Sequence, residues 1–387
     1  MLPSSRPAHL KNKMRILAWP LTTPWNPYTG MVYAHLGAGA QADGWPGNLL
    51  RKYAVWHVHW PDALLNIPNA AHAVYKLAGM FATMDYLRAR GTKVIWTMHN
   101  FAAHEARHPR LEPWFWRQFI QRVDGAISLS ATALAMALER FPRLQKIPTM
   151  VIPHGHYRQQ YPPAARDVRA ELGIPGRAKV LMFFGAVRAY KNVEVLVRAF
   201  REVRREDAVL CVVGNPNTED LAERLRKEAS QDGRVKLLFE FVDAKDVAAY
   251  LSTADLVVLP YREVLNSGSA LLALSCSRPV LVPDRGSLGE LKAEFGDTWV
   301  RTFREDLDGV ILEAALEWAL HGARPEVCDM PGKYSWEHIG SETVRFYERV
   351  VSTAPRRRTN EALRNYRPRS DGSELFDVSC EGESRER

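Results

Sequence analysis

The sequence predicts an α/β protein in which parallel strands alternate with helices. Three observations support this fold class. Short apolar runs of strand length recur along the 387 residues, and segments with apolar residues at helical spacing follow them. The same alternation occurs in both halves of the chain, and the 46% of hydrophobic residues can fill two cores. We therefore expect two α/β domains of similar construction.

The first half begins with a strand at Met14, and further strands are expected at residues 55–60, 93–98 and 125–129. Residues 70–90 have the spacing of a helix and are expected to pack on the core. Because this segment is unusually apolar, a membrane-facing or lipid-acceptor role is the alternative. The expected strand at residues 55–60 is closed by Pro61 and Asp62.

Histidines, a glycine and prolines cluster at residues 154–163 and indicate a domain boundary with a hinge near Gly155. The first 13 residues and the charged tail lack apolar periodicity, so we expect both to be disordered. The predicted organisation is a disordered start (1–13), a first domain (14–157), a second domain (158–333), a late helix (334–351) and a disordered tail (352–387).

The most informative stretch of the second half is residues 179–200, which reads as strand, loop and helix. Its loop carries Arg188 and Lys191 and should lie at the carboxyl edge of a parallel sheet, where ligands bind. Arg188 can grip two phosphate oxygens while Lys191 supplies a point charge, so the loop suits a diphosphate. The alternative is an ordinary surface loop with two basic residues.

Two further stretches in the second half can bind a ligand. Ser267, Gly268 and Ser269 precede an apolar helix, whose free N–H groups and positive dipole end suit a phosphate. The alternative is an ordinary serine cap. Residues 285–290 are expected to form a loop that ends in Glu290, a carboxylate able to accept both hydroxyls of a ribose or a sugar.

Acid and base groups gather after the predicted strand 93–98. His99, His104 and Glu105 follow it, and a histidine near a carboxylate can act as general base on a hydroxyl. Loop histidines that cap backbone groups are the alternative. His57 and His59 share one face of the preceding strand; they can bind metal, but with no Cys or acidic partner nearby we favour buried, hydrogen-bonded side chains.

Charge and cysteine usage limit the class of protein. The formal net charge of +8 favours anionic partners: nucleic acid, a membrane surface or phosphorylated small molecules. The cluster at residues 356–358 lies in the tail, so we expect no nucleic acid. The cysteines are scattered and expected to be reduced, as in a cytoplasmic protein, and no apolar run approaches the roughly 20 residues that span a bilayer. The four cysteines are Cys211, Cys276, Cys328 and Cys380.

Five stretches resemble glycosyltransferases of the group 1 superfamily, with similarity from about Met14 to Val351. They are FFGAVRAYKNVEVLVRAF, VIPHGHY, SGSALLALSCSRPVLVP, GSLGE and YSWEHIGSETVRFYERV. The resemblance implies the GT-B fold, with two Rossmann-like domains facing each other across a cleft. The first domain would bind the acceptor and the second the nucleotide sugar. A late helix at residues 335–350 would cross back to the first domain.

The resemblance also implies a donor site and a chemistry. The basic pair and the serine-rich helix start would hold the donor diphosphate, without metal or other cofactor. Many retaining members have two glutamates eight positions apart; here Glu263 is near the first position, but an apolar residue, around Leu272, occupies the second. This departure favours an inverting mechanism. The expected donor-binding residues are Arg188, Lys191, Asn192, Tyr261, Ser267, Gly268, Ser269 and Glu290.

The stretches HNFAAHE and WHVHWPD resemble bacterial sugar transferases of polysaccharide assembly, including β-mannosyltransferases that use GDP-mannose and a lipid-linked acceptor. We expect His99 or Glu105 to be the base, with His104 and Asp62 behind them. The acceptor would be a glycan or a polyprenyl-linked sugar at an anionic membrane, so the enzyme would be cytoplasmic and peripheral on the inner face of the plasma membrane. Alternatives are a UDP-sugar-dependent glucuronosyl- or glucosyltransferase, a retaining group 1 transferase, and a non-enzymatic sugar-nucleotide-binding protein.

Overall fold

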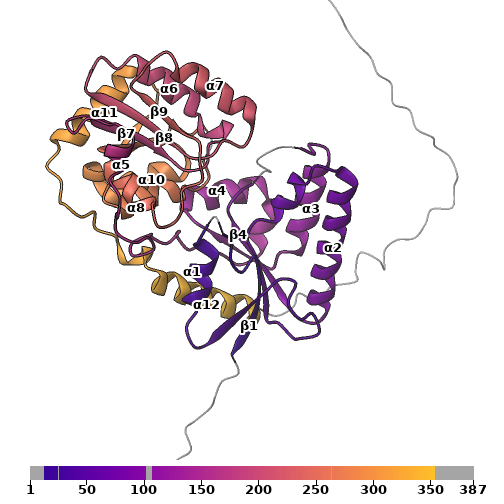
Figure 1. Ribbon diagram of the computed structural model, residues 1–387. Coiled ribbons are helices and arrows are strands. Elements are labelled where there is room, and N and C mark those ends of the chain that lie inside the picture. Colours follow the sequence, from indigo (N-terminus) through magenta and orange to yellow (C-terminus); the bar gives the residue numbers. More distant parts are fainter. Residues whose placement is uncertain (1–12, 25, 102–106, 263, 354–387) are drawn as a thin grey trace, which may run out of the picture. The chain divides into compact units, whose positions relative to one another are not determined.

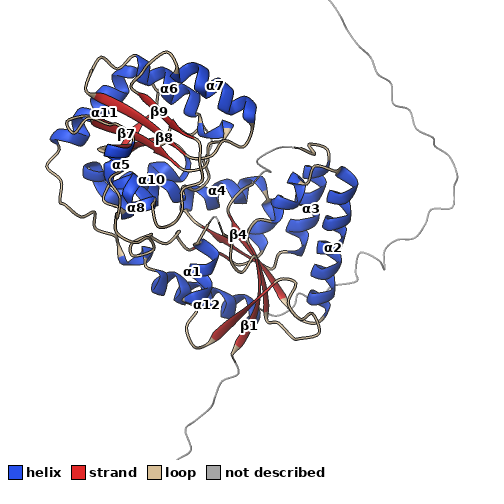
Figure 2. Cartoon of the chain, viewed as in Figure 1, coloured by secondary structure: helices blue, strands red, loops and turns tan. Residues whose placement is uncertain are grey.

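The structure, a computed structural model, describes residues 13–24, 26–101, 107–262 and 264–353 (Figure 1). The segments 1–12 and 354–387, which we expected to be disordered, lie outside the described residues, as does Cys380. The described residues up to Ser352 belong to one compact unit. Within it are two separate six-stranded sheets, which confirms the predicted α/β class (Figure 2).

The first sheet is parallel throughout and has the strand order β2-β1-β3-β4-β5-β6. Its strands are β1 (Met14–Trp19), β2 (Ala40–Gly44), β3 (Val55–Val58), β4 (Lys93–Met98), β5 (Gly125–Ser128) and β6 (Thr149–Val151). The accompanying helices are α1 (Tyr28–Ala34), α2 (Ala70–Ala89), α3 (Leu111–Arg122) and α4 (Ala131–Arg140). The strand order reverses between β1 and β3, so ligands are expected at the carboxyl ends of these strands.

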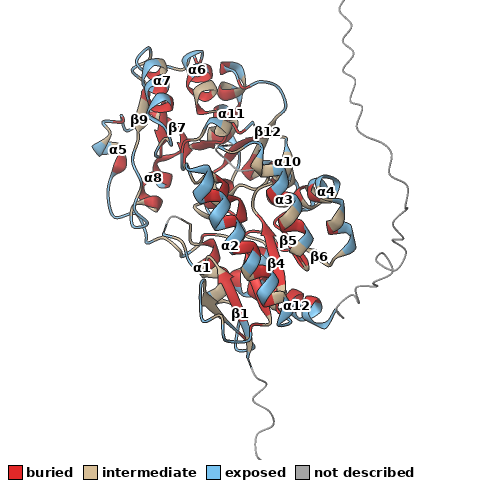
Figure 3. Ribbon diagram, turned by 90° about the vertical axis from the view of Figure 1, so that its right-hand side faces the viewer, coloured by how far each residue is buried: buried red, intermediate tan, exposed pale blue. Residues whose placement is uncertain are grey.

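The central strands of the first sheet are buried (Figure 3), and the two faces of the sheet pack against different residues. Trp56 and Trp96 point to the face packed with α2 and α3, which includes Leu77 and Phe115. The alternate residues point to the opposite face, which α1 and α12 (Trp336–Ser352) cover. The residues of this second face are Ile16, Val55, Ile95 and Ile127 on the strands, with Tyr28, Val32, Trp336, Ile339 and Phe346 on the helices.

The second sheet is also parallel and has the order β12-β11-β10-β7-β8-β9. Its strands are β7 (Lys179–Phe184), β8 (Ala208–Val213), β9 (Val235–Leu238), β10 (Leu256–Val258), β11 (Val280–Pro283) and β12 (Val300–Phe303). Its helices are α5 (Val168–Glu171), α6 (Val193–Arg201), α7 (Glu219–Ala229), α8 (Val247–Thr253), α9 (Gly268–Ser275), α10 (Gly286–Trp299) and α11 (Gly309–His321). The order reverses between β7 and β10, the point where doubly wound sheets bind their ligands.

The structure corrects two expectations from the sequence. Residues 285–290 are not a loop, because α10 begins at Gly286 and places Glu290 in its second turn. Strand β2 follows α1 at residues 40–44, where we expected no strand. Segment 70–90 does pack on the core, as α2, with Leu77, Met84 and Leu87 fully buried.

Helix α12 packs on the first sheet although it follows the second in the chain. Its first residue, Trp336, donates from Nε1 to the carbonyl of His156 at 2.8 Å. Its indole covers Gly155, where a Cβ would lie only 2.4 Å from the ring. No helix in the described ranges is long and apolar enough to cross a membrane.

A substitution at Gly155, which contacts Trp336, tests the packing of α12 on the first sheet. Gly155→Ala should lower the free energy of unfolding by about 1–3 kcal/mol, because a rigid indole blocks the added methyl group. Urea unfolding followed by circular dichroism measures the change. Gly79→Ala in the middle of α2 is the control: nothing lies within 4 Å of its Cβ position, so it should stabilise the fold by up to about 1 kcal/mol. Equal stability of the Gly155→Ala variant and the parent would contradict the packing.

Candidate active site

The switch point of the second sheet brings a lysine and a serine together. Gly185 ends β7 with a φ of 124°, and a Cβ there would lie 3.1 Å from Oγ of Ser269 and 3.6 Å from Nζ of Lys191. Only glycine leaves this space open. Burial lowers the pKa of Lys191, and no carboxylate in the described ranges lies within salt-bridge distance of it. An ammonium group without a counter-ion, beside a hydroxyl and an open backbone, is suited to an anion.

Tyr261 completes the wall of this site. It follows β10, on the other side of the switch point, and its ring centre lies 5.4 Å from Nζ of Lys191. Burial raises the pKa of Tyr261 to about 12, and its buried hydroxyl has no hydrogen-bond partner among the described residues. Its hydroxyl therefore stays protonated near neutral pH and can act as a hydrogen-bond donor. Three of the expected donor-binding residues thus lie together.

Arg188 is placed differently from Lys191. Its Nη1 donates to the carbonyl oxygens of Val187 at 2.8 Å and Asn215 at 3.1 Å, so its guanidinium is held against the backbone after β8. Asn192, which joins this loop to α6, has a left-handed backbone (φ 58°) and caps no N–H with its side chain. Arg188 and Lys191 thus have different surroundings, and their expected binding to one diphosphate stays a prediction.

The start of α9 faces the first sheet's loops. Ser267 caps the helix, with Oγ accepting from the N–H of Ala270 at 3.2 Å. At Gly268 a Cβ would stand 3.0 Å from the hydroxyl of Tyr157 and 3.7 Å from Nε2 of His154. The serine cap that we considered as the alternative is therefore present, and it leaves Ser269 free to face Lys191.

Glu290 contacts the amino terminus of α4. Its Oε1 accepts from the N–H of Thr132 at 2.5 Å, and its Oε2 accepts from that of Ala131 at 3.3 Å. The carboxylate is stabilised there by two free N–H groups and the positive end of the helix. Its predicted hydroxyl-binding role would therefore require it to leave this position. A cavity of about 40 Å³, room for about one water molecule, lies beside it.

Of the predicted acid and base residues, His99 and Asp62 can be placed, whereas His104 and Glu105 lie outside the described residues. His99 directly follows β4 and stacks on the ring of Trp60 at 4.2 Å. Tyr28 of α1 meets it edge-on at 5.0 Å. Burial lowers the pKa of His99 well below its usual value, and nearby His154 and His57 lower it further, so the ring is neutral at pH 7.

The interpretation of His57 and His59 as buried, hydrogen-bonded side chains is confirmed. Nε2 of His57 lies 2.7 Å from the hydroxyl of Thr97, and its Nδ1 lies 2.7 Å from that of Tyr347. Nε2 of His59 lies 2.7 Å from the hydroxyl of Tyr33. Burial lowers the pKa of His57 to about 3 and that of His59 well below the usual value. Within the described part of the chain, no group of three or more His, Cys, Asp or Glu could hold a metal ion.

Asp62 also lies at this edge, immediately after β3. It is 2% exposed, and its Oδ2 accepts from Nδ2 of Asn100 at 3.3 Å. Burial raises the pKa of Asp62 to about 7. A carboxyl group with this pKa can hold or release a proton near neutral pH.

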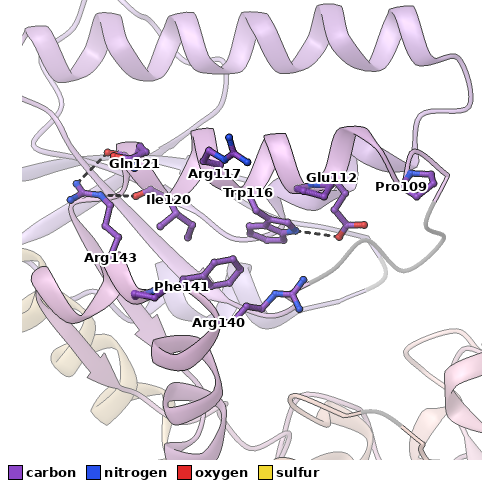
Figure 4. A pocket seen from close by; sticks show the side chains of 11 residues that line it. Pro109, Glu112, Trp116, Arg117, Ile120, Gln121, Arg140, Phe141 and Arg143 are labelled. Carbon is purple, nitrogen blue, oxygen red and sulfur yellow. Dashed lines mark hydrogen bonds between the residues drawn. The ribbon is translucent and has the colours of Figure 1, made fainter. Parts of the chain in front are cut away.

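The sequence did not predict a cavity of about 560 Å³ in the first half of the chain (Figure 4). It lies between α3 and the segment that ends α4 and begins a short 3-10 helix (Pro142–Lys146). The rings of Trp116 and Phe141, 5.4 Å apart, line it, and Arg117, Arg140 and Arg143 surround them. Trp116 and Ile120 have the spacing of a helix that packs on a core, which does not indicate a cavity. Nothing in the sequence indicated that residues 140–143 lie beside them.

Lys191 gives the most direct test of the donor site. Lys191→Ala should weaken binding of a nucleoside diphosphate by about 10- to 100-fold, since a hydrogen bond to a charged group contributes about 1.5–3 kcal/mol. Calorimetric titration measures this affinity. The control is Lys227→Ala on the exposed face of α7, which should bind as the parent does. If the Lys191→Ala variant bound the nucleoside diphosphate as tightly as the parent, this lysine would not be part of the donor site.

Comparison with known proteins identifies the family. A family model described as "Glycosyl transferases group 1" matches residues 178–307, which include the Lys191 and Ser269 site. The GDP-mannose:glycolipid 4-beta-D-mannosyltransferase of Xanthomonas campestris pv. campestris is 32% identical over 324 residues, 83% of this chain and 88% of that protein. An uncharacterized glycosyltransferase of Methanocaldococcus jannaschii is 29% identical over 47% of this chain and 48% of its own.

Solved structures share the fold at lower identity. Anabaena HepE in complex with UDP and glucose has a TM-score of 0.61 and 13% identity, and covers 88% of this chain and 99% of its own. Sucrose-phosphate synthase from Thermosynechococcus elongatus has a TM-score of 0.57 and 16% identity over 88% and 96%. The fold is therefore that of GT-B glycosyltransferases. With its matching domain and a relative similar along most of its length, the chain belongs to the group 1 glycosyltransferases.

Proposed function

We propose that this glycosyltransferase moves mannose from GDP-mannose to a glycan on a lipid carrier, with inversion at the anomeric carbon. The observation that carries the proposal is the convergence of Lys191, Ser269 and Tyr261 at the switch point of the second sheet, a site suited to a diphosphate. The choice of donor and acceptor is supported by the Xanthomonas relative, whose name specifies GDP-mannose and a glycolipid.

In the proposed reaction the acceptor hydroxyl attacks the anomeric carbon while the bond to the donor diphosphate breaks. Lys191, the Ser269 hydroxyl and the start of α9 stabilise the charge that develops on the leaving diphosphate. Arg188 and Glu290 join the site once they leave their present backbone partners. No metal ion is required in this scheme, because these groups supply the charge that a metal would supply.

The base in this scheme is His99. It stands at the carboxyl edge of the first sheet, and its neutral ring can take the proton of the acceptor hydroxyl. Glu105 and His104 stay candidates from the sequence, and Asp62, with its pKa near 7, is the alternative among the described residues. Inversion is supported by Leu272, a buried apolar residue of α9 where many retaining members have a glutamate. Glu263, near the first glutamate position, lies outside the described residues.

A panel of nucleotides tests the donor. GDP and GDP-mannose should raise the melting temperature, equally with EDTA or magnesium, because a ligand that binds only the folded state stabilises it. UDP and its sugar conjugates should give no comparable shift. A shift with UDP-sugars alone would favour the glucuronosyl- or glucosyltransferase alternative. GDP-mannose binding without transfer to any lipid-linked acceptor would favour a binding protein.

We propose that the membrane that carries the acceptor contacts the protein beside the cavity of Figure 4. Residues 107–146 carry seven Arg or Lys and three Asp or Glu, half of the formal net charge of +8. Arg117, Arg140 and Arg143 form no ion pair with any described residue, whereas Arg198 and Arg226 of the second half do. Trp114, 41% exposed, lies on the same helix as Trp116. Arginines without an ion pair, on the same helix or next to a helix with an exposed Trp side chain, suit the headgroups of an anionic bilayer.

Vesicle sedimentation tests this membrane contact. The double variant Arg117→Gln/Arg140→Gln should bind vesicles rich in anionic phospholipid about 30-fold more weakly, since each basic residue near the surface contributes about 1 kcal/mol. The matched control, Arg198→Gln/Arg226→Gln, removes the same charge from the second half and should bind as the parent does. If both double variants lost vesicle binding equally, net charge alone would explain the binding. If neither lost it, the surface beside this cavity would not be the membrane contact.

A further inference from the structure

A chain of buried rings lies behind His99. His59 is fully buried and has both ring nitrogens engaged: Nδ1 lies 3.1 Å from Nε2 of His99, and Nε2 lies 2.7 Å from the hydroxyl of Tyr33. The same hydroxyl lies 3.1 Å from Nδ1 of His57. These contacts follow from strand alternation, which puts His57 and His59 on the face of the sheet covered by α1 and α12.

Only one proton is shared between the facing nitrogens of His59 and His99. Both rings are neutral, because burial lowers the pKa of each, so each ring carries a single N–H. If Nε2 of His99 carries its proton and donates to His59, the lone pair of His99 is at Nδ1. If His59 donates instead, Nδ1 of His99 carries the proton and cannot accept another. The tautomer of His59 therefore decides whether His99 is a base at Nδ1.

The surrounding contacts allow the productive arrangement. Nε2–H of His59 can donate to the oxygen of Tyr33, whose own proton is then directed at Nδ1 of His57, a nitrogen that it shares with the Tyr347 hydroxyl 2.7 Å away. Trp60 and Tyr28 hold the His99 ring in place from its face and its edge. Within the described residues, no hydrogen bond reaches Nδ1 of His99, so this nitrogen has no protein partner there.

We propose that His59, supported by Tyr33, is a positioning residue that keeps His99 in the Nε2–H tautomer and so leaves Nδ1 to receive the acceptor's proton. This inference rests on the proposed function, in which His99 is the base. In the step, the proton passes from the acceptor hydroxyl to Nδ1, the oxygen bonds to the anomeric carbon, and the diphosphate leaves with the electron pair of the broken bond. The imidazolium that forms donates from Nε2 to His59.

Imidazole nitrogen NMR tests the tautomer without turnover. With ¹⁵N-histidine labelling, and the His99 signals assigned by their loss in His99→Gln, the parent should show the Nε2–H form of His99. Tyr33→Phe, which removes the hydroxyl behind His59, should give a mixture of tautomers. The matched control is Tyr347→Phe, since this hydroxyl bonds His57 but not His59; there the His99 signals should stay as in the parent. An Nδ1–H form of His99 in the parent overturns the proposal.

Kinetics give the second readout. Tyr33→Phe should lower kcat by about 10-fold and His59→Gln by about 100-fold, within the range that general-base catalysis contributes, while donor affinity is unchanged. Tyr347→Phe should stay within about twofold of the parent. Equal losses in both tyrosine variants would show a merely structural role. Full turnover in His99→Gln would refute the base of the proposed function, whereas the NMR result would still decide whether His59 sets the tautomer.

Discussion

The parallel direction of both sheets is the constraint on which the rest of the structure depends. Parallel strands need crossover connections, and these cover both faces of each sheet with helices. Only the carboxyl edges of the strands stay open to a ligand. The first sheet places His59 and His99 at that edge, directly after β3 and β4, with Asp62 in the short 3-10 helix after β3, and the second places Gly185 and Tyr261 there. The candidate site is thus made of residues that follow strands, and its chemistry can vary without change to either core.

Full burial of both faces also explains the network of histidines. A polar side chain on such a strand cannot reach water and must find a partner on the covering helix. His57 and His59 find theirs in Tyr33 of α1 and Tyr347 of α12. Burial lowers the pKa of both rings and keeps them neutral, while these partners fix the orientation of the rings.

The sequence predicted the fold where the signal was strong and local. Strand β4 matches its expected bounds, because its apolar run is long and ends at polar residues. Strand β2, with the sequence AQADG, has little apolar pattern, and the start of α10 contains two glycines, so both were missed. Burial of His57 could be predicted from strand periodicity, but not its partner, since Tyr347 is 290 positions away. The hydrogen bonds of Glu290 to α4 are likewise set by tertiary contact, which spacing alone does not reveal.

That long sequence separation affects how the protein is made. Ribosomes add about 5–20 residues per second, so roughly 15–60 s pass between synthesis of β3 and synthesis of α12. During this time one face of the first sheet has no α12 to cover Val55, Ile95 and Ile127, and the His57 ring lacks one of its hydroxyl partners. The second sheet, whose core is made from consecutive elements, has all its strands before then. The half synthesised first is therefore the half completed last, and a nascent chain that stalls before α12 exposes an apolar sheet to chaperones and to aggregation.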